Sequence, residues 1–161
     1  MAKVTEDRTG LDNLISNLRQ LQTKEVEAGV ISSQQHPNFN GTVASLGALY
    51  EYGFERKYPK TGETRKVEAP FIQPVDTDSS NHKYVNKEFL RHLPLMISKK
   101  NTGTELLDQI GKEMAEEYKD YIKSGEVQFT VAGQYVPKQD GTRLIDTTTL
   151  VNSITYEVVR D

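Results

Sequence analysis

Histidine and carboxylate side chains are the first candidates for chemistry in this sequence. It contains three histidines, His36, His82 and His92. Within a predicted helix, His92 has a carboxylate, Glu88, at the spacing of a helical metal site. We interpret Glu88 and His92 as a pair on the surface of a helix. His36 and His82 stand in polar loop segments, where a hydrogen bond within a turn is the expected role.

A polar segment at 76–81, DTDSSN, places oxygen-bearing side chains at alternate positions, as a calcium-binding loop does. It lacks the glycine at the sixth position and the glutamate at the twelfth, so we interpret it as a polar loop before a helix. The absence of cysteine excludes thiolate metal sites, thiol nucleophiles and disulfides. The glycine motifs that bind phosphates or expose a catalytic serine are also missing, and we expect neither metal nor other cofactor.

The segment LIDTTTLVNSITYEV, at 144–158, gathers an aspartate and several hydroxyl side chains. A nucleophilic threonine or serine needs a nearby base, and no histidine or lysine is close in the sequence. We predict instead that Asp146 or Thr147 caps a short helix. Leu150 and Ile154, four residues apart, would bury one side of that helix before the chain enters a terminal strand. This segment is therefore predicted to be a structural joint.

The N-terminal third alternates helical and extended patterns. Apolar residues at three- and four-residue steps predict an amphipathic helix over 11–21, with Thr9 and Asp12 resembling a capping box. Strict alternation over 24–31 predicts a strand with one buried face. A second helix is predicted over 43–52, with Thr42 as its cap and Gly53 at its end.

A strand is the alternative for the second of these helices, because Tyr50, Tyr52 and Phe54 also alternate. The stretch that follows, 54–80, is long, charged and interrupted by prolines and glycine. Lys60-Thr61-Gly62-Glu63 is typical of the turn of an extended hairpin. Aromatic residues are rare in plain linkers, so this stretch is predicted to be an arm that becomes ordered against another chain.

The second half contains the clearest helix. Asn86 is predicted to cap a helix that Pro94 kinks or restarts. Thr102 and Glu105 form a capping box for the longest helix, over 104–123, which Gly125 ends. Strands are predicted at 127–131 and 155–160.

Composition indicates one domain over residues 1–161 that carries the arm at 54–80. The 161 residues are 35% hydrophobic and 27% charged, with a net charge of −3 and a pI near 5.7. This net charge argues against a protein that binds nucleic-acid phosphates, because such proteins usually carry a strong excess of basic residues. No apolar run approaches the roughly 20 residues of a membrane span, and the first residues contain no secretion signal. The order of the predicted elements, with strands among helical segments, agrees with an α+β fold.

Three segments together resemble one family of viral proteins. The run Leu144–Tyr156 is similar to the L-x-D-T-G-x-L-x-x-S-I-x-Y segment of tail-completion and neck proteins of tailed bacteriophages, including virion morphogenesis relatives. Leu49-Tyr50-Glu51-Tyr52-Gly53 is similar to their E-F/Y-G element, and Ala69-Pro70-Phe71-Ile72 to a P-x-R-x-F segment. Thr148 stands where the family has glycine, and the arginine before the phenylalanine is missing.

The resemblance implies a structural virion protein without catalysis. It implies an α+β fold with a mixed, mainly antiparallel sheet flanked by helices. Such proteins assemble as rings, typically hexamers, at the head-proximal end of the tail, after synthesis in the host cytoplasm. Their partners are copies of themselves, the tail-tube protein and the head connector or neck proteins, and DNA passes through the ring without specific binding.

Contacts between subunits are expected at aromatic residues of the arm and at the terminal strand: Tyr52, Phe54, Tyr58, Phe71, Tyr156, Val158 and Val159. Two other function classes remain open. One is a monomeric binding or regulatory module, which the mass in solution would distinguish from a ring subunit. The other is a small hydrolase that uses Asp146 and His92, which would require a concave site.

Overall fold

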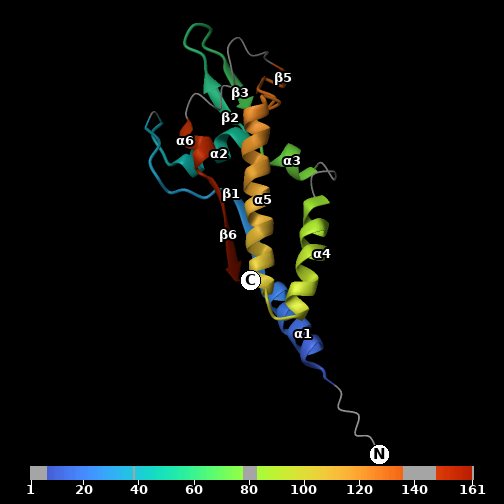
Figure 1. Cartoon of the computed structure of the whole chain (residues 1–161). Helices are drawn as coiled ribbons and strands as arrows, with labels where there is room; N and C mark the ends of the chain where they lie inside the picture. Colours follow the sequence, from blue (N-terminus) through green and yellow to red (C-terminus); the bar gives the residue numbers. More distant parts are fainter. Residues whose placement is uncertain (1–6, 38, 78–82, 136–147, 161) are drawn as a thin grey trace, which may run out of the picture.

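The computed structural model describes residues 7–37, 39–77, 83–135 and 148–160. The molecule is elongated, and its axis is the long helix α5 (Gly103–Ser124), with the described elements arranged around it (Figure 1). Helices and antiparallel sheets both contribute, so the fold is α+β, as the sequence predicted. The predicted mixed sheet takes the form of two separate sheets, and all strand pairs of the described residues are antiparallel.

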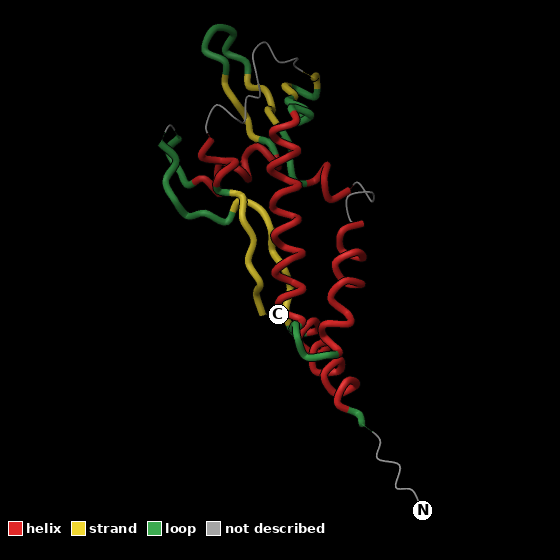
Figure 2. The backbone as a smooth tube through the Cα atoms, in the orientation of Figure 1, coloured by secondary structure: helices red, strands yellow, loops and turns green. Residues whose placement is uncertain are grey.

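Strands β1 (Lys24–Val30) and β6 (Ile154–Arg160) form a two-stranded antiparallel sheet, called the ribbon below. It lies along α5, on the opposite side from helix α4 (Lys83–Ile97) (Figures 1 and 2). A Cβ added at Gly111 of α5 would lie 2.4 Å from the Tyr156 ring and 2.9 Å from Val26. Glycine at this position therefore allows the ribbon to lie directly on the helix.

The second sheet has the order β2-β3-β4-β5. Its first two strands, β2 (Phe54–Lys57) and β3 (Thr64–Glu68), form a hairpin that projects beyond the C-terminal end of α5 (Figures 1 and 2). The short strands β4 (Thr130–Val131) and β5 (Gln134–Tyr135) pair at its base. Residues 54–68 are called the hairpin below.

At the other end of the molecule, α1 (Thr9–Gln22) packs against α4 and α5. The buried side chain of Asn17 joins the three helices. Its Nδ2 donates to the carbonyl of Met96 at 3.2 Å, and its Oδ1 accepts from the N–H of Gly103 at 3.0 Å. The Asn17 side chain thus gives the N–H of Gly103, at the start of α5, an acceptor. It also adds a second donor to the Met96 carbonyl, which accepts from the N–H of Lys99 at 3.3 Å.

The main core lies where α2 (Val43–Tyr52), α3 (Gln73–Thr77) and α6 (Thr148–Asn152) meet the C-terminal half of α5. Burial of these apolar side chains is the main stabilising contribution to the fold. Its buried members are Val43, Ala69, Phe71, Val75, Ala115, Tyr118, Ile122, Val127, Leu150, Val151 and Ile154.

Most of the predicted elements are confirmed. Thr42 caps α2 by accepting from the N–H of Ser45, and Gly53 follows the helix with a φ of +83°. Thr102 and Glu105 form both bonds of the capping box at the start of α5, and Gly125 ends the helix in the left-handed region. Helix, not strand, is therefore the outcome for 43–52.

Several boundaries were wrong. Arg8, not Thr9, stands at the N-cap of α1, and the Thr9 N–H donates to the Asp7 carboxylate instead. Helix α4 begins at Lys83, so Asn86 lies inside it, and it continues through Pro94. Of the strand predicted at 127–131, the structure has strand only over Thr130–Val131.

Only the first half of the arm predicted at 54–80 projects from the protein. Residues 54–68 form the projecting hairpin, but Ala69 and Phe71 are fully buried and Val75 nearly so. The apolar side chains that suggested a partner chain are used, in this second half, by the protein's own core. Residues 78–80 lie outside the described part of the chain.

Candidate functional site

The outer part of the hairpin carries two arginines on one face. Arg56 and Arg65 lie directly opposite each other in the β2–β3 register, and both are exposed. Their Cζ atoms lie 5.5 Å and 5.6 Å from the centre of the Tyr58 ring, which is the geometry of cation–π contacts. Glu63 forms an ion pair with Arg65, and its hydrogen bond and charge raise the pKa of Arg65. Tyr58, a predicted contact residue, thus holds a basic pair at an exposed position.

The base of the hairpin is anchored to the core. The ring of Phe54 meets the ring of Tyr50 edge to face, with centroids 6.0 Å apart, and the opposite residue, Val67, is buried. Tyr52, at the end of α2, is 80% exposed. Of the predicted aromatic contact residues, Tyr52 is therefore the one with the most surface free for a partner.

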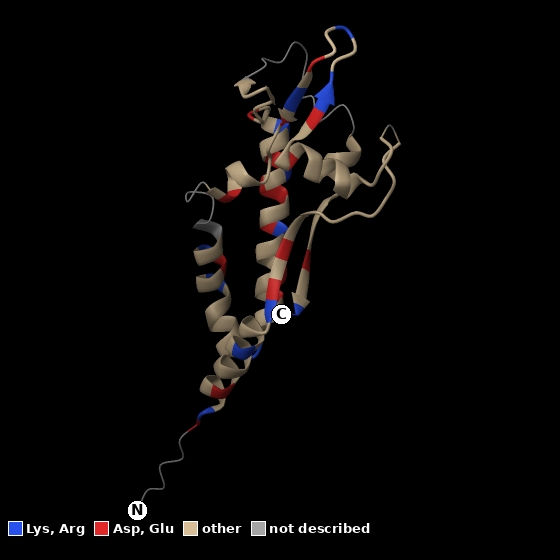
Figure 3. Cartoon of the chain, turned by 180° about the vertical axis from the view of Figure 1, so that it is seen from behind, with Lys and Arg blue, Asp and Glu red and all other residues tan. Residues whose placement is uncertain are grey.

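The ribbon has one face against α5 and one outer face. Glu27 and Glu157 lie directly opposite each other in the register, with Glu25 two residues along β1, and all three side chains are exposed. Figure 3 shows these acidic positions on the ribbon and the basic positions on the hairpin. Among the described residues, none of the three glutamates forms an ion pair. The outer face is therefore anionic and not neutralised by the described part of the chain.

The two edges of the ribbon are also open. In the described residues, β1 pairs with β6 and with no other strand. Each strand consequently has an outer row of backbone N–H and C=O groups that pairs with no strand in the described part of the chain. Open edges of this kind are templates for pairing with another chain.

Three predicted contact residues face the protein's own interior. Phe71 has no exposed surface, so it cannot offer a contact to a neighbouring subunit. Tyr156 lies over Gly111 and donates a hydrogen bond of 3.0 Å to Asp108, which raises the pKa of its phenol. Val158 alternates onto the same inner face, and Val159 lies on the outer one, opposite Glu25.

Helix α1 exposes part of its apolar stripe. Leu11, Ile15 and Leu18 follow one another at helical spacing and are 56%, 39% and 40% exposed. Ile97 at the end of α4 adds a fourth apolar side chain that is 40% exposed. Contiguous exposed apolar surface is typical of a contact with another protein.

Glu51, within the E-Y-G element, is a residue whose role sequence reasoning missed. Its Oε2 accepts from the backbone N–H groups of Phe71 and Ile72 at 2.8 Å and 2.9 Å, and its Oε1 from that of Gln73 at 2.7 Å. The carboxylate thus fixes the start of α3 relative to the end of α2. The sequence did contain one signal of this role, which is a charged residue at a helix end that is otherwise apolar and aromatic.

Glu88 and His92 do form a pair, but the prediction that it lies on the surface was wrong. Their exposed fractions are 2% and 7%, and His92 Nε2 lies 3.6 Å from Glu88 Oε2. The other ring nitrogen of His92 lies 3.0 Å from the amide of Asn101, and Arg91 forms an ion pair with Glu88. Both buried groups are thereby given polar partners within α4 and the turn that follows it.

The remaining candidates for chemistry gain little support. His36 is buried in the 32–41 loop, where its backbone N–H donates to the carbonyl of Gly41. No group of three or more potential metal ligands occurs among the described residues. His82, most of the 76–81 segment, and the predicted caps Asp146 and Thr147 lie outside the described residues.

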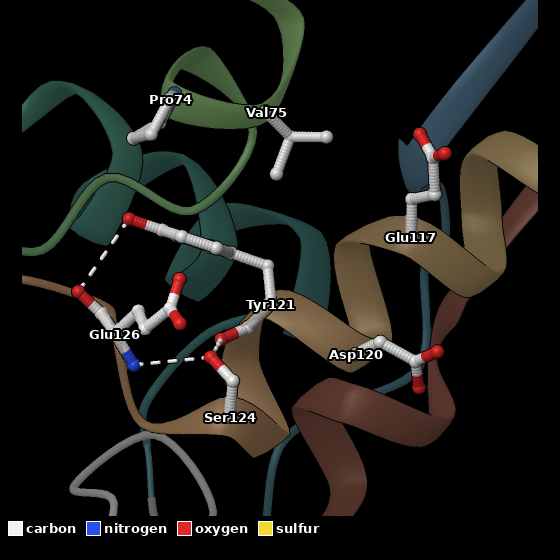
Figure 4. Close-up of a pocket in the computed structure, with 7 residues that line it drawn as sticks. All are labelled: Pro74, Val75, Glu117, Asp120, Tyr121, Ser124 and Glu126. Atoms are coloured by element: carbon white, nitrogen blue, oxygen red, sulfur yellow. Dashed lines mark hydrogen bonds between the residues drawn. The ribbon is translucent and has the colours of Figure 1, made fainter. Parts of the chain in front are cut away.

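A hollow lies beside the C-terminal end of α5 (Figure 4). Tyr121 and Ser124 are tied there to the backbone of Glu126, by bonds of 3.5 Å and 3.1 Å. Burial, together with the charges of Glu126 and Glu51, raises the pKa of the Tyr121 phenol. The two hydrogen bonds close the C-terminal end of α5. The hollow is lined by Pro74, Val75, Glu117, Asp120, Tyr121, Ser124 and Glu126.

Comparison of the chain with models of protein families, with curated proteins and with solved structures found no match. None of the described helices has the length and apolar composition that crossing a membrane requires. The surfaces described above are therefore the features on which a functional interpretation rests.

Proposed function

We propose that this protein is a structural subunit of a tailed-bacteriophage particle. In this proposal it assembles as a ring, with six copies as the expected number, at the head-proximal end of the tail. There it ends growth of the tail tube or joins the finished tail to the head connector. It acts by binding, without turnover of a substrate.

The observation that carries this proposal is the open, two-stranded ribbon. A two-stranded sheet is marginal by itself in water, and this one leaves both edges free of described partners. Natural monomers usually cover or blunt such edges. A chain that works as one segment of a larger assembly instead completes them with its neighbours. The sequence resemblance supplies the type of assembly.

The elongated shape supports a ring. The hairpin lies at one end of the long axis, and α1, with its exposed Leu11, Ile15 and Leu18, lies at the other (Figure 1). Different surfaces at different ends favour head-to-tail contacts over a two-fold contact of one surface with itself. Head-to-tail contacts generate a ring when the rotation between neighbours closes.

The charge of the chain suits a ring that DNA crosses. A net charge of −3 gives no general attraction for phosphates, so DNA would pass through the channel without adsorbing to it. Tight binding of duplex DNA at physiological salt would contradict this part of the proposal. A filter-binding titration over a range of salt concentrations measures it.

The test of the whole proposal is assembly. Sedimentation of the purified chain should give a mass several times that of the 18.2 kDa subunit, and electron microscopy should show rings. Added to tail-tube protein, these rings should cap tube ends and stop tube growth. A monomer that forms no rings and does not bind tubes would refute the proposal and favour a monomeric binding module.

A further inference from the structure

We propose that neighbouring copies join through the hairpin of one copy and the outer face of the ribbon of the next. In this contact Arg56 and Arg65 of one copy face Glu27 and Glu157 of the other. The inference rests on the proposed ring and specifies the contact that holds it together. It commits to one occupant for the acidic face, namely a second copy of this chain.

The hairpin supplies a basic pair that the described residues balance only in part. Arg56 and Arg65 are cross-strand neighbours, and like charges directly opposite each other destabilise a strand pair. Glu63 neutralises Arg65, but no carboxylate of the described residues forms an ion pair with Arg56. The whole hairpin has five basic and three acidic side chains, so it is positively charged within a negatively charged protein.

The ribbon supplies the complementary pair. Glu27 and Glu157 repeat the arrangement with the opposite sign, as exposed cross-strand neighbours, and Glu25 adds a third carboxylate on the same face. In isolation this arrangement also costs stability. A partner that brings two cations to this face would remove the repulsion and add charge-assisted hydrogen bonds.

The spacing of the two pairs matches. Residues directly opposite in antiparallel strands have Cβ atoms about 4.5–5.5 Å apart, and this holds for Arg56 with Arg65 and for Glu27 with Glu157. Two guanidinium groups at this spacing can each meet one carboxylate, and the fork of donors on arginine suits that geometry. The Tyr58 ring holds both guanidinium groups toward the same side.

The contact has to join two copies. The hairpin projects beyond the C-terminal end of α5, whereas the acidic part of the ribbon lies along its N-terminal half (Figures 1 and 3). One chain therefore cannot bring its own two surfaces together. Each copy offers one basic and one acidic surface at different places, and such a contact is head-to-tail and can close into a ring.

Charge reversal tests the contact with two variants of the full chain. The first carries Arg56→Glu and Arg65→Glu, and the second carries Glu27→Arg and Glu157→Arg. Each variant alone has two surfaces of the same sign, so its association constant should fall by about 100-fold or more. Mixed in equal amounts, the variants should assemble again, because the acidic hairpin of one fits the basic ribbon of the other.

Sedimentation and native mass spectrometry read out the result, and the mixture should contain the two variants in alternation. Circular dichroism checks that each variant is folded. In the ribbon variant, the repulsion between two glutamates across β1 and β6 is replaced by repulsion between two arginines at the same positions. A matched control for the hairpin variant carries Lys87→Glu and Lys100→Glu, both exposed on or beside α4. It makes the same change in net charge as the hairpin variant and should assemble normally.

The outcomes separate this inference from the proposed function. Loss of assembly in each variant, recovery in the mixture and a normal control support the contact. Rings that form equally well from either variant alone overturn the contact and leave the proposed ring intact. Failure of the mixture to recover, with both variants folded, also overturns the contact. A wild-type chain that is monomeric at all concentrations overturns both.

Discussion

Replacement of Glu51 should reveal how much one carboxylate contributes to this fold. The three backbone N–H groups at the start of the α3 segment, Phe71 to Gln73, all donate to it, at 2.7–2.9 Å. In Glu51→Ala these donors lose their acceptor, and those of Phe71 and Ile72 are only partly open to water. An unsatisfied buried donor costs about 1–3 kcal/mol, so we expect a loss of about 3–5 kcal/mol in the free energy of unfolding.

Glu51→Gln should lower the free energy of unfolding by less than Glu51→Ala does. One oxygen, Oε2, accepts from both Phe71 and Ile72, and the amide oxygen of glutamine can replace it. The amide nitrogen would then face the N–H of Gln73, which is exposed and can bond to water. The loss of one charge-assisted bond corresponds to about 1–2 kcal/mol.

Urea unfolding monitored by circular dichroism, at one fixed protein concentration, measures both changes. The control is Glu55→Ala, which removes an exposed glutamate four residues later and should stay within about 0.5 kcal/mol of the wild type. Hydrogen exchange of the Phe71 and Ile72 amides should accelerate in Glu51→Ala. The reasoning is refuted if alanine costs no more than the control, or if glutamine costs as much as alanine.

Three further changes test the contacts around α5. Gly111→Ala places a Cβ 2.4 Å from the Tyr156 ring, so overpacking of about 1–3 kcal/mol should outweigh the gain of about 1 kcal/mol in helix propensity and lower the melting temperature. Asn17→Leu leaves the N–H of Gly103 without its acceptor and should cost about 1–3 kcal/mol in urea unfolding. Asp108→Ala removes the hydrogen bond that raises the pKa of Tyr156, so an NMR titration should show the phenol deprotonating at lower pH.

Controls for these changes come from neighbouring exposed positions. Lys112→Ala should leave the melting temperature nearly unchanged, and a stabilised Gly111→Ala variant would show that the ribbon does not press on the helix. Ser16→Leu adds the same side chain beside Asn17 on the exposed side of α1, and an equal loss in both variants would contradict the role of the Asn17 hydrogen bonds. An unchanged Tyr156 midpoint in Asp108→Ala would show that the hydrogen bond is not made.

Sequence alone determined the features that depend on neighbouring residues. The capping box of α5, the Thr42 cap of α2 and the alternation of β1 and β6 involve groups within about one helical turn or along one strand. Apolar periodicity likewise identified the longest helix. Leu150 and Ile154 are both buried as predicted, but Ile154 begins β6 and does not belong to the short helix α6. These elements could be predicted because the residues that stabilise each of them lie in the same short segment as the sequence pattern that indicates it.

Tertiary structure decided which distant groups meet. Phe71 was predicted as an exposed contact, but it is buried because the segment that Glu51 anchors turns into the core. Glu88 and His92 had the spacing of a surface pair, and the packing of α4 buried them.

The acidic pair of the ribbon shows the same limit most clearly. Glu27 and Glu157 belong to opposite ends of the chain, and each looks like an ordinary solvated glutamate in its own strand. Only the antiparallel register of β1 with β6 places them side by side on one face. A local sequence pattern predicts on which face of a strand a residue lies. Which residue lies opposite it in the sheet depends on contacts between segments far apart in sequence.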